Sequence, residues 1–362
     1  MIARRRKALQ FVRRLPSGVH KKFERPLPRV RASDEICPPR MIHTVSLKLI
    51  EVSSNSPDTP TPQYAILSHR WNSRAGQEIS YEEFLQSPRS RATKRKIGYQ
   101  KILLGCKQAR IDKLDYLWVD TCCIDQEDIG DVHQNIKSMF AYYQHSCVCY
   151  AYLADVDSDA ELNDELTEYG TCHQPDTMIP KKVIDHEPPS LEFKHFKKSE
   201  WHRRGWTLQE LLAPKEVFFF DQSWKYLGTR SVRAREIQSA TGIPEDVIQG
   251  KTCIHDVNVK ERMSWSTLRV TSKAPDQAYC LFGILGVTIE PDYSEDVKTA
   301  FNRLREAYIK QYPDKAIIEF GWHVYGGDIF SNLLKQISQR HVQGGPVKKV
   351  DLHELDANEW TE

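Results

Sequence analysis

Long apolar runs and several common catalytic motifs are missing from this sequence of 362 residues. The longest apolar run extends from Cys147 to Ala154, whereas a membrane-spanning helix needs about 20 apolar residues, so we expect no membrane span. The motifs G-x-G-x-x-G, H-E-x-x-H and G-x-S-x-G do not occur. Gly250-Lys251-Thr252 matches the end of a phosphate-binding loop, but Glu245 occupies the position of the first glycine. The sequence therefore does not support nucleotide binding by a P-loop.

Cysteine pairs with metal-binding spacing are also missing. The nine cysteines are an odd number, and no apolar secretory signal precedes them, which favours reduced thiols in a cytoplasmic protein. The close pairs Cys122-Cys123 and Cys147-Val-Cys149 lack the C-x-x-C spacing that places two thiolates on one tetrahedral ion. We therefore expect no metal site.

Charge of one sign is concentrated in a short amino-terminal segment. The first 31 residues hold 11 basic residues and one acid, so the rest of the chain keeps 40 basic and 48 acidic residues, a net charge of −8. Such a body is a poor partner for nucleic acid, whose affinity depends on neutralised phosphates. We expect residues 1–40 to be a disordered basic extension. A mitochondrial presequence is the less favoured alternative, because Pro16, Pro26 and Pro28 interrupt the segment.

The composition and the apolar patterns predict a globular α/β protein. Hydrophobic residues make up 40% of the chain and charged residues 28%, which is near the average for folded domains. Four short, continuously apolar runs have the length and content of strands buried on both faces of a mainly parallel sheet; they are Tyr64–Ser68, Tyr116–Asp120, Cys147–Leu153 and Glu216–Asp221. Helical periodicity lies between them, as in Tyr99, Ile102, Leu103 and Cys106. This alternation predicts a three-layer sheet domain.

The domain boundaries follow from changes in this pattern. We expect the α/β core at 41–229, with a polar, acidic insertion at 155–199. Residues 230–312 have helical periodicity without intervening strands, which predicts an α-helical extension. The tail, 313–362, has no pattern that assigns it.

Three polar segments could carry chemistry, because ligands of open parallel sheets bind beyond the carboxyl ends of the strands. The first is Ser68-His-Arg-Trp71, the second begins at Asp120 and extends to Gln126, and the third is Trp201–Leu212. Trp206 and Glu210 in the third segment are four residues apart, so a helix there places a carboxylate beside an aromatic ring.

Each of these side chains also has a structural interpretation. Glu210 could be an exposed helix acid or the ion-pair partner of Arg203 or Arg204. Asp120 and Gln126 could bind a ligand, or Asp120 could cap the next turn. His69 could face a ligand or be a satisfied structural histidine. The tryptophans could belong to the core and the arginines to surface ion pairs.

Three segments closely resemble the three blocks of the fungal heterokaryon incompatibility (HET) domain, in the same order and spacing. They are Tyr64-Ala-Ile-Leu-Ser-His-Arg-Trp71, Trp118-Val-Asp-Thr-Cys-Cys-Ile-Asp-Gln126 and Trp201-His-Arg-Arg-Gly-Trp-Thr-Leu-Gln-Glu210. The likeness continues through Thr241-Gly-Ile-Pro, Glu261-Arg-Met-Ser-Trp and Asp276–Gly286, and covers roughly Met41 to Tyr312. Asn72 and Ser294 depart from it, since family members usually carry glycine there.

The resemblance implies a role in fungal non-self recognition and cell death, and a fold similar to TIR domains. Trp206-x-x-x-Glu210-Leu211 is similar to the TIR block whose glutamate is catalytic in those TIR proteins that cleave NAD, so Glu210 is the implied catalytic residue. The other implied binding residues are Ser68, His69, Arg70, Trp71, Asp120, Arg204 and Trp206. NAD would be a substrate, not a permanently bound cofactor. The implied partners are a second copy of the chain or another signalling or receptor protein. The alternatives are a non-catalytic module that signals by self-assembly and an inactive relative that retains only the fold.

Overall fold

The computed structural model describes residues 36–52, 61–72, 74–158 and 194–320. Within them, seven strands form one sheet in the order β2-β1-β4-β3-β5-β6-β7. The strands are β1 (Arg40–His43), β2 (Leu49–Glu51), β3 (Tyr64–His69), β4 (Tyr116–Trp118), β5 (Val148–Tyr152), β6 (Val217–Phe220) and β7 (Tyr226–Thr229). The four central strands are parallel, and β1 and β7 are antiparallel to their central neighbours. The prediction of a mainly parallel α/β sheet is therefore confirmed.

The four central strands are the four predicted from apolar runs. Every residue of β3, β5 and β6 is buried, which explains their continuously apolar sequences. The prediction that the second strand continues to Asp120 was wrong, because β4 ends at Trp118 and Asp120 begins the short helix α5 (Asp120–Cys123).

Three strands were not predicted. β2 has one half-buried residue, Leu49, and two exposed ones, so it forms no apolar run. β1 has only four residues, which are too few to show an alternation of apolar and polar positions. In β7, Gly228 interrupts the strand pattern with a φ of 127°. These strands form through pairing with neighbours, so their own sequences indicate them weakly.

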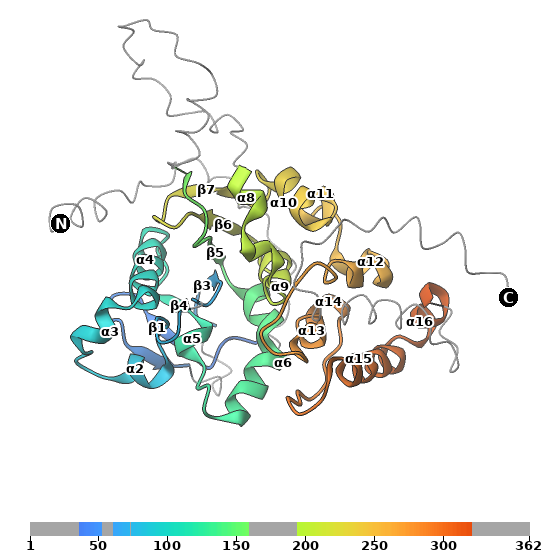
Figure 1. The fold of residues 1–362 in the computed structure, drawn as a ribbon, viewed down its shortest axis with the longest axis horizontal. Coiled ribbons are helices and arrows are strands. Elements are labelled where there is room, and N and C mark those ends of the chain that lie inside the picture. Colours follow the sequence, from blue (N-terminus) through green and yellow to red (C-terminus); the bar gives the residue numbers. More distant parts are fainter. Residues whose placement is uncertain (1–35, 53–60, 73, 159–193, 321–362) are drawn as a thin grey trace, which may run out of the picture.

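Helices cover both faces of the sheet. Leu117 and Trp118 are adjacent in β4 and so point to opposite faces. Leu117 lies against Gly105 of α4 (Ile97–Ile111), whereas Trp118 packs its ring against Tyr142 and Tyr143 of α6 (Ile129–His145). Figure 1 shows α4 on one side of the strands, with α6 and α9 on the other. The layers are therefore helix, sheet and helix.

The remaining helices frame this core. Those before β6 are α2 (Tyr81–Leu85), α3 (Arg91–Arg95), α8 (Lys194–Lys198), the 3-10 turn η3 (Glu200–Arg203) and α9 (Thr207–Leu212). Those after β7 are α10 (Ala234–Thr241), α11 (Glu245–Ile248), η4 (Ile254–Asp256), α12 (Val259–Ser264), α13 (Asp276–Tyr279), α14 (Phe282–Leu285), α15 (Val297–Gln311) and α16 (Pro313–Phe320). No strand follows β7 in the described residues. We call residues 230–320 the helical extension, since α16 continues the helices past Tyr312.

Some predictions fall on residues outside the described ranges. These are nearly all of the basic extension (1–35), most of the polar insertion (159–193) and the tail from 321. No helix among the described residues is both long and apolar enough to cross a membrane.

Candidate functional site

A pocket of about 160 Å³ lies at the carboxyl ends of β3 and β4. Five of the eight predicted site residues line it, namely Trp71, Asp120, Arg204, Trp206 and Glu210. Further wall comes from α6 and the loop before it, through Ile124, Gln126, Val132, Ile136, Met139 and Tyr143. The helical extension supplies Thr271, Ser272, Lys273, Asp276 and Tyr293. The pocket is therefore shared between the sheet and the extension.

Glu210 lies on α9 with 7% of its surface exposed. The Ser68 hydroxyl, near the carboxyl end of β3, donates a short hydrogen bond to Glu210 Oε2, and Ser68 Oγ accepts one of 2.8 Å from Trp201 Nε1. Burial raises the pKa of Glu210 to about 7, aided by the negative charge of Asp120 and opposed by the hydrogen bond from Ser68. Glu210 is thus neither an exposed acid nor a direct ion-pair partner, and both its protonation states are populated near neutral pH.

Asp120 and Trp71 form the second polar contact of the pocket. Trp71 Nε1 donates a hydrogen bond of 2.6 Å to Asp120 Oδ2, so this carboxylate holds an indole and not a backbone turn. The other oxygen, Oδ1, is buried without a hydrogen bond. Burial raises the pKa of Asp120 as well.

His69 lies behind Asp120 and does not line the pocket. Its Nε2 is 3.7 Å from Asp120 Oδ1 and 3.9 Å from Glu78 Oε2. Burial, together with the charges of Lys101 and Arg204, lowers the pKa of His69 well below its usual value. The ring is therefore neutral, and these contacts are not ion pairs. Lys101 Nζ instead pairs with Glu78 Oε1 at 2.8 Å.

Of the two arginines in the predicted site, one lies at the pocket and the other does not. The Arg204 guanidinium lies 5.9 Å from the centre of the Trp71 ring, at the pocket. Arg70 is exposed and does not line the pocket. Ser68 reaches the pocket only through Glu210.

The part of the pocket wall that comes from the helical extension is not predicted by the sequence. Tyr293 donates a hydrogen bond of 2.8 Å to Asp276 Oδ1, and Lys273 Nζ lies 4.1 Å from the centre of the Tyr293 ring. Burial raises the pKa of Asp276, while hydrogen bonds from Trp206 and Tyr293 oppose this. The block Asp276–Gly286 was noted in the sequence, but nothing in its spacing indicates that it approaches Glu210.

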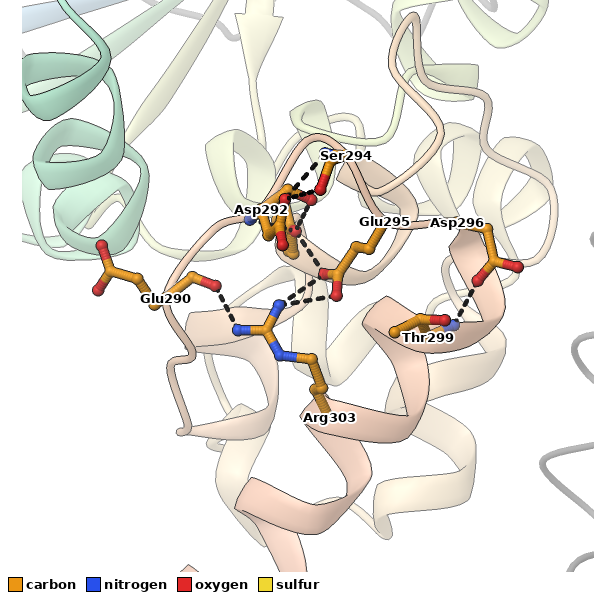
Figure 2. Close-up of polar contacts among 8 residues, drawn as sticks. Glu290, Asp292, Ser294, Glu295, Asp296, Thr299 and Arg303 are labelled. Atoms are coloured by element: carbon orange, nitrogen blue, oxygen red, sulfur yellow. Dashed lines mark hydrogen bonds and ion pairs between the residues drawn. The ribbon is translucent and has the colours of Figure 1, made fainter.

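A network of ion pairs and hydrogen bonds fixes the loop that carries Tyr293. Figure 2 shows Arg303 of α15 reaching Glu295 and the backbone of Glu290, with Asp292 beside them. Arg303 Nη1 lies 2.8 Å from both carboxylate oxygens of Glu295, and Nη2 donates to the Glu290 carbonyl at 2.6 Å. Lys137 of α6 pairs with the Glu290 side chain at 2.8 Å. The loop is thereby tied to both α15 and α6.

A second contact joins the segment around Arg204 to the extension. Val270 N donates to Arg203 O at 2.7 Å, and Gly205 N donates to Val270 O at 3.0 Å. A Cβ added at Gly205 would lie 2.4 Å from Thr271 Cγ2, closer than real Cβ atoms approach other side chains. Only glycine therefore allows these two segments to lie so close.

Among the described residues, no group of three or more His, Cys, Asp or Glu side chains is arranged to hold a metal ion. The pocket instead combines buried carboxyls with indole and phenol rings and two cationic side chains. Such a set can bind a ligand that has aromatic rings and both signs of charge.

Comparison with known proteins relates the part of the chain that holds the three blocks to a known family of domains. The family model described as "Heterokaryon incompatibility protein (HET)" matches residues 64–210, which span all three blocks noted in the sequence. The chain is also similar to "Vegetative incompatibility protein HET-E-1" of Podospora anserina, with 37% identity over 257 residues, or 71% of this chain and 17% of that protein. The matched stretch thus spans under a fifth of that relative. No solved structure matches the chain, so the likeness to TIR domains stays a prediction. Residues 64–210 of this chain, from the start of β3 to Glu210 on α9, therefore carry a heterokaryon incompatibility (HET) domain.

Proposed function

We propose that this protein acts in fungal heterokaryon incompatibility, where it triggers cell death through TIR-like cleavage of NAD. The relative from Podospora anserina is named for vegetative incompatibility, which supports the biological part of the proposal. The chemical part depends on the pocket.

The observation that carries the chemical proposal is the position of Glu210. Its carboxyl group is nearly buried, accepts a hydrogen bond from Ser68, and faces a pocket with Trp71 and Trp206 in its walls. The rings can stack on the planar parts of a dinucleotide. The volume of about 160 Å³ is smaller than the roughly 300–1,000 Å³ of typical ligand pockets, so NAD would place its nicotinamide riboside half inside and the remainder along the mouth.

One carboxylate is enough for this reaction. The bond between nicotinamide and ribose breaks heterolytically, and nicotinamide leaves with the electron pair as a neutral base because the pyridinium already carries a positive charge. No general acid is needed, unlike in ordinary glycoside hydrolysis. Ionised Glu210 would stabilise the positive charge that develops at the anomeric carbon. Water then adds to this carbon and loses a proton, which gives ADP-ribose.

The experiment is a measurement of nicotinamide release from NAD by the purified full-length chain, over a range of protein concentrations that includes high ones, because self-association could assemble the site. Glu210→Ala should lower the rate at least about 100-fold, the usual effect of losing transition-state stabilisation. Glu261→Ala, at an exposed position on α12 outside the pocket, is the matched control and should leave the rate unchanged. Circular dichroism verifies that both variants are folded.

The pH dependence gives a second test of the same residue. Because the ionised form is the active one and the pKa of Glu210 is about 7, kcat/KM should rise with pH and level off above about pH 8. If no nicotinamide is released at any concentration or pH, and Glu210→Ala still kills cells, the enzymatic proposal is wrong. The non-catalytic alternative, a module that signals by self-assembly with its own copies or a receptor protein, then remains.

A further inference from the structure

The most buried charged residues of the pocket are acids. Of the three acids that line the pocket, Glu210 and Asp276 are each only 7% exposed, and Asp120 is half-buried. The two basic side chains lie further out, since Arg204 is half-buried and Lys273 is exposed. A ligand with a positive and a negative part would therefore enter with its positive part first.

Neither basic side chain is neutralised by a close carboxylate. In the described ranges, Arg204 and Lys273 have no acidic partner at ion-pair distance, and each lies near an aromatic ring, Trp71 and Tyr293 respectively. The buried carboxyl of Asp276 senses the charge of both, because both lower its pKa. Arg204 also lowers the pKa of Asp120 and of Glu210 from beyond ion-pair distance. Because neither cation has an acidic partner at ion-pair distance in the described residues, both remain available to an anion in the pocket.

Hydrogen bonds hold the main-chain segments that carry Arg204 and Lys273 in a fixed relation. Arg204 and Val270 pair as a parallel bridge, and Arg269 Nη1 donates to the Arg204 carbonyl at 2.9 Å. Thr271 Oγ1 then donates to the Lys273 carbonyl at 2.7 Å, which fixes the turn that leads to the lysine. Because the main chain is arranged before the ligand arrives, binding has to order only the side chains.

We infer that Arg204 and Lys273 together form a subsite for the diphosphate of a nucleotide ligand, so that the helical extension is part of the binding site. This inference rests on the proposed function, because it assigns the rim of the pocket to the diphosphate of NAD while the cationic ring lies near Glu210. A guanidinium and an ammonium can meet the two negative charges of a diphosphate with charge-assisted hydrogen bonds. The deeper carboxyls would repel phosphate, which sets the orientation of the ligand.

Equilibrium binding to the full-length chain tests the subsite without requiring catalysis. Isothermal titration calorimetry would compare ADP-ribose, which has the diphosphate and lacks nicotinamide, with nicotinamide riboside, which has the cationic ring and no phosphate. Lys273→Ala should weaken ADP-ribose binding about tenfold, as expected for a lost hydrogen bond to a charged group, and should change nicotinamide riboside binding by less than about twofold. Lys273→Arg should retain most of the affinity.

Lys260→Ala is the matched control, because Lys260 is an exposed lysine of the same extension that lies outside the pocket; it should bind both ligands as the unsubstituted chain does. Unchanged ADP-ribose affinity in Lys273→Ala, or no ADP-ribose binding by the unsubstituted chain, would overturn the subsite even if NAD is cleaved. Lysine-dependent ADP-ribose binding by a chain that never releases nicotinamide would support the subsite and contradict the proposed function.

Discussion

At the scale of the residue, ionisation of the Glu210 carboxyl group lowers the stability of the folded protein. It is nearly buried, and the Ser68 hydroxyl and the more distant Arg204 and Arg269 compensate only partly for the loss of water around the carboxylate. Its pKa in the folded protein, about 7, is above the ordinary value of 4.5. This carboxyl therefore contributes stability that is fully present below about pH 4.5 and is lost as the pH rises through 7.

We expect Glu210→Gln to remove this loss. The amide keeps an oxygen that can accept the hydrogen bond from Ser68, and it does not ionise. The variant should match the unsubstituted protein near pH 4.5 and should be more stable at pH 8, by up to about 3 kcal/mol from the linkage between pKa and folding. Urea unfolding at both pH values measures the difference. Glu261→Gln, at an exposed position, is the control and should show no such pH-dependent gain. If the difference in stability between Glu210→Gln and the unsubstituted protein is the same at both pH values, ionisation of Glu210 is not its cause.

At the scale of the element, local sequence predicts the central strands and one side of the pocket. Strands such as β3 are buried along their whole length, so their apolar runs can be recognised without knowing which strands lie beside them. The spacing of Trp206 and Glu210 likewise follows from one helix. In contrast, Asp276 and Tyr293 reach the pocket through the bridge at Val270 and the loop held by Arg303. These contacts join segments that are far apart in the sequence, so no local pattern of apolar and polar residues indicates them.

The close approach at Gly205 gives the element-scale prediction. In Gly205→Ala the new Cβ would meet Thr271 Cγ2 at 2.4 Å and Cys280 Sγ at 3.3 Å. The two segments must move apart, which should cost about 1–3 kcal/mol of stability, as in other overpacked cores, and should displace Lys273 from Arg204. Thermal unfolding and ADP-ribose binding would report the two effects.

A second substitution identifies the atom responsible. Thr271→Ser removes Cγ2 and keeps the hydroxyl that donates to the Lys273 carbonyl. The double variant Gly205→Ala with Thr271→Ser should therefore recover most of the stability lost by Gly205→Ala, since contacting residues couple in double-mutant cycles. Purely additive effects of the two substitutions would show that another contact determines the role of the glycine.

At the scale of the whole molecule, the sheet and the extension share one core. Buried apolar residues form a continuous cluster from Met41 to Ala316. The contact between α6 and α14 is so close that a Cβ at Gly283 would lie 1.9 Å from Phe140 Cγ. The Lys137–Glu290 pair adds a polar link between the same two parts. The extension is thus packed into the domain and not attached by a linker, and Figure 1 shows α14 beside α6. Its share of the pocket wall agrees with this packing.

A shared core predicts that the sheet and the extension unfold together. Hydrogen exchange measured by mass spectrometry, at increasing urea concentration, would follow α4 (Ile97–Ile111) on the sheet and α15 (Val297–Gln311) in the extension. Both helices should lose protection at the same midpoint, because neither part can expose its face of the common cluster without exposing the other. Earlier loss in α15, with α4 still protected, would mean that the extension opens independently. Bound ADP-ribose should raise both midpoints by the same amount, since a ligand that touches both parts stabilises them as one unit.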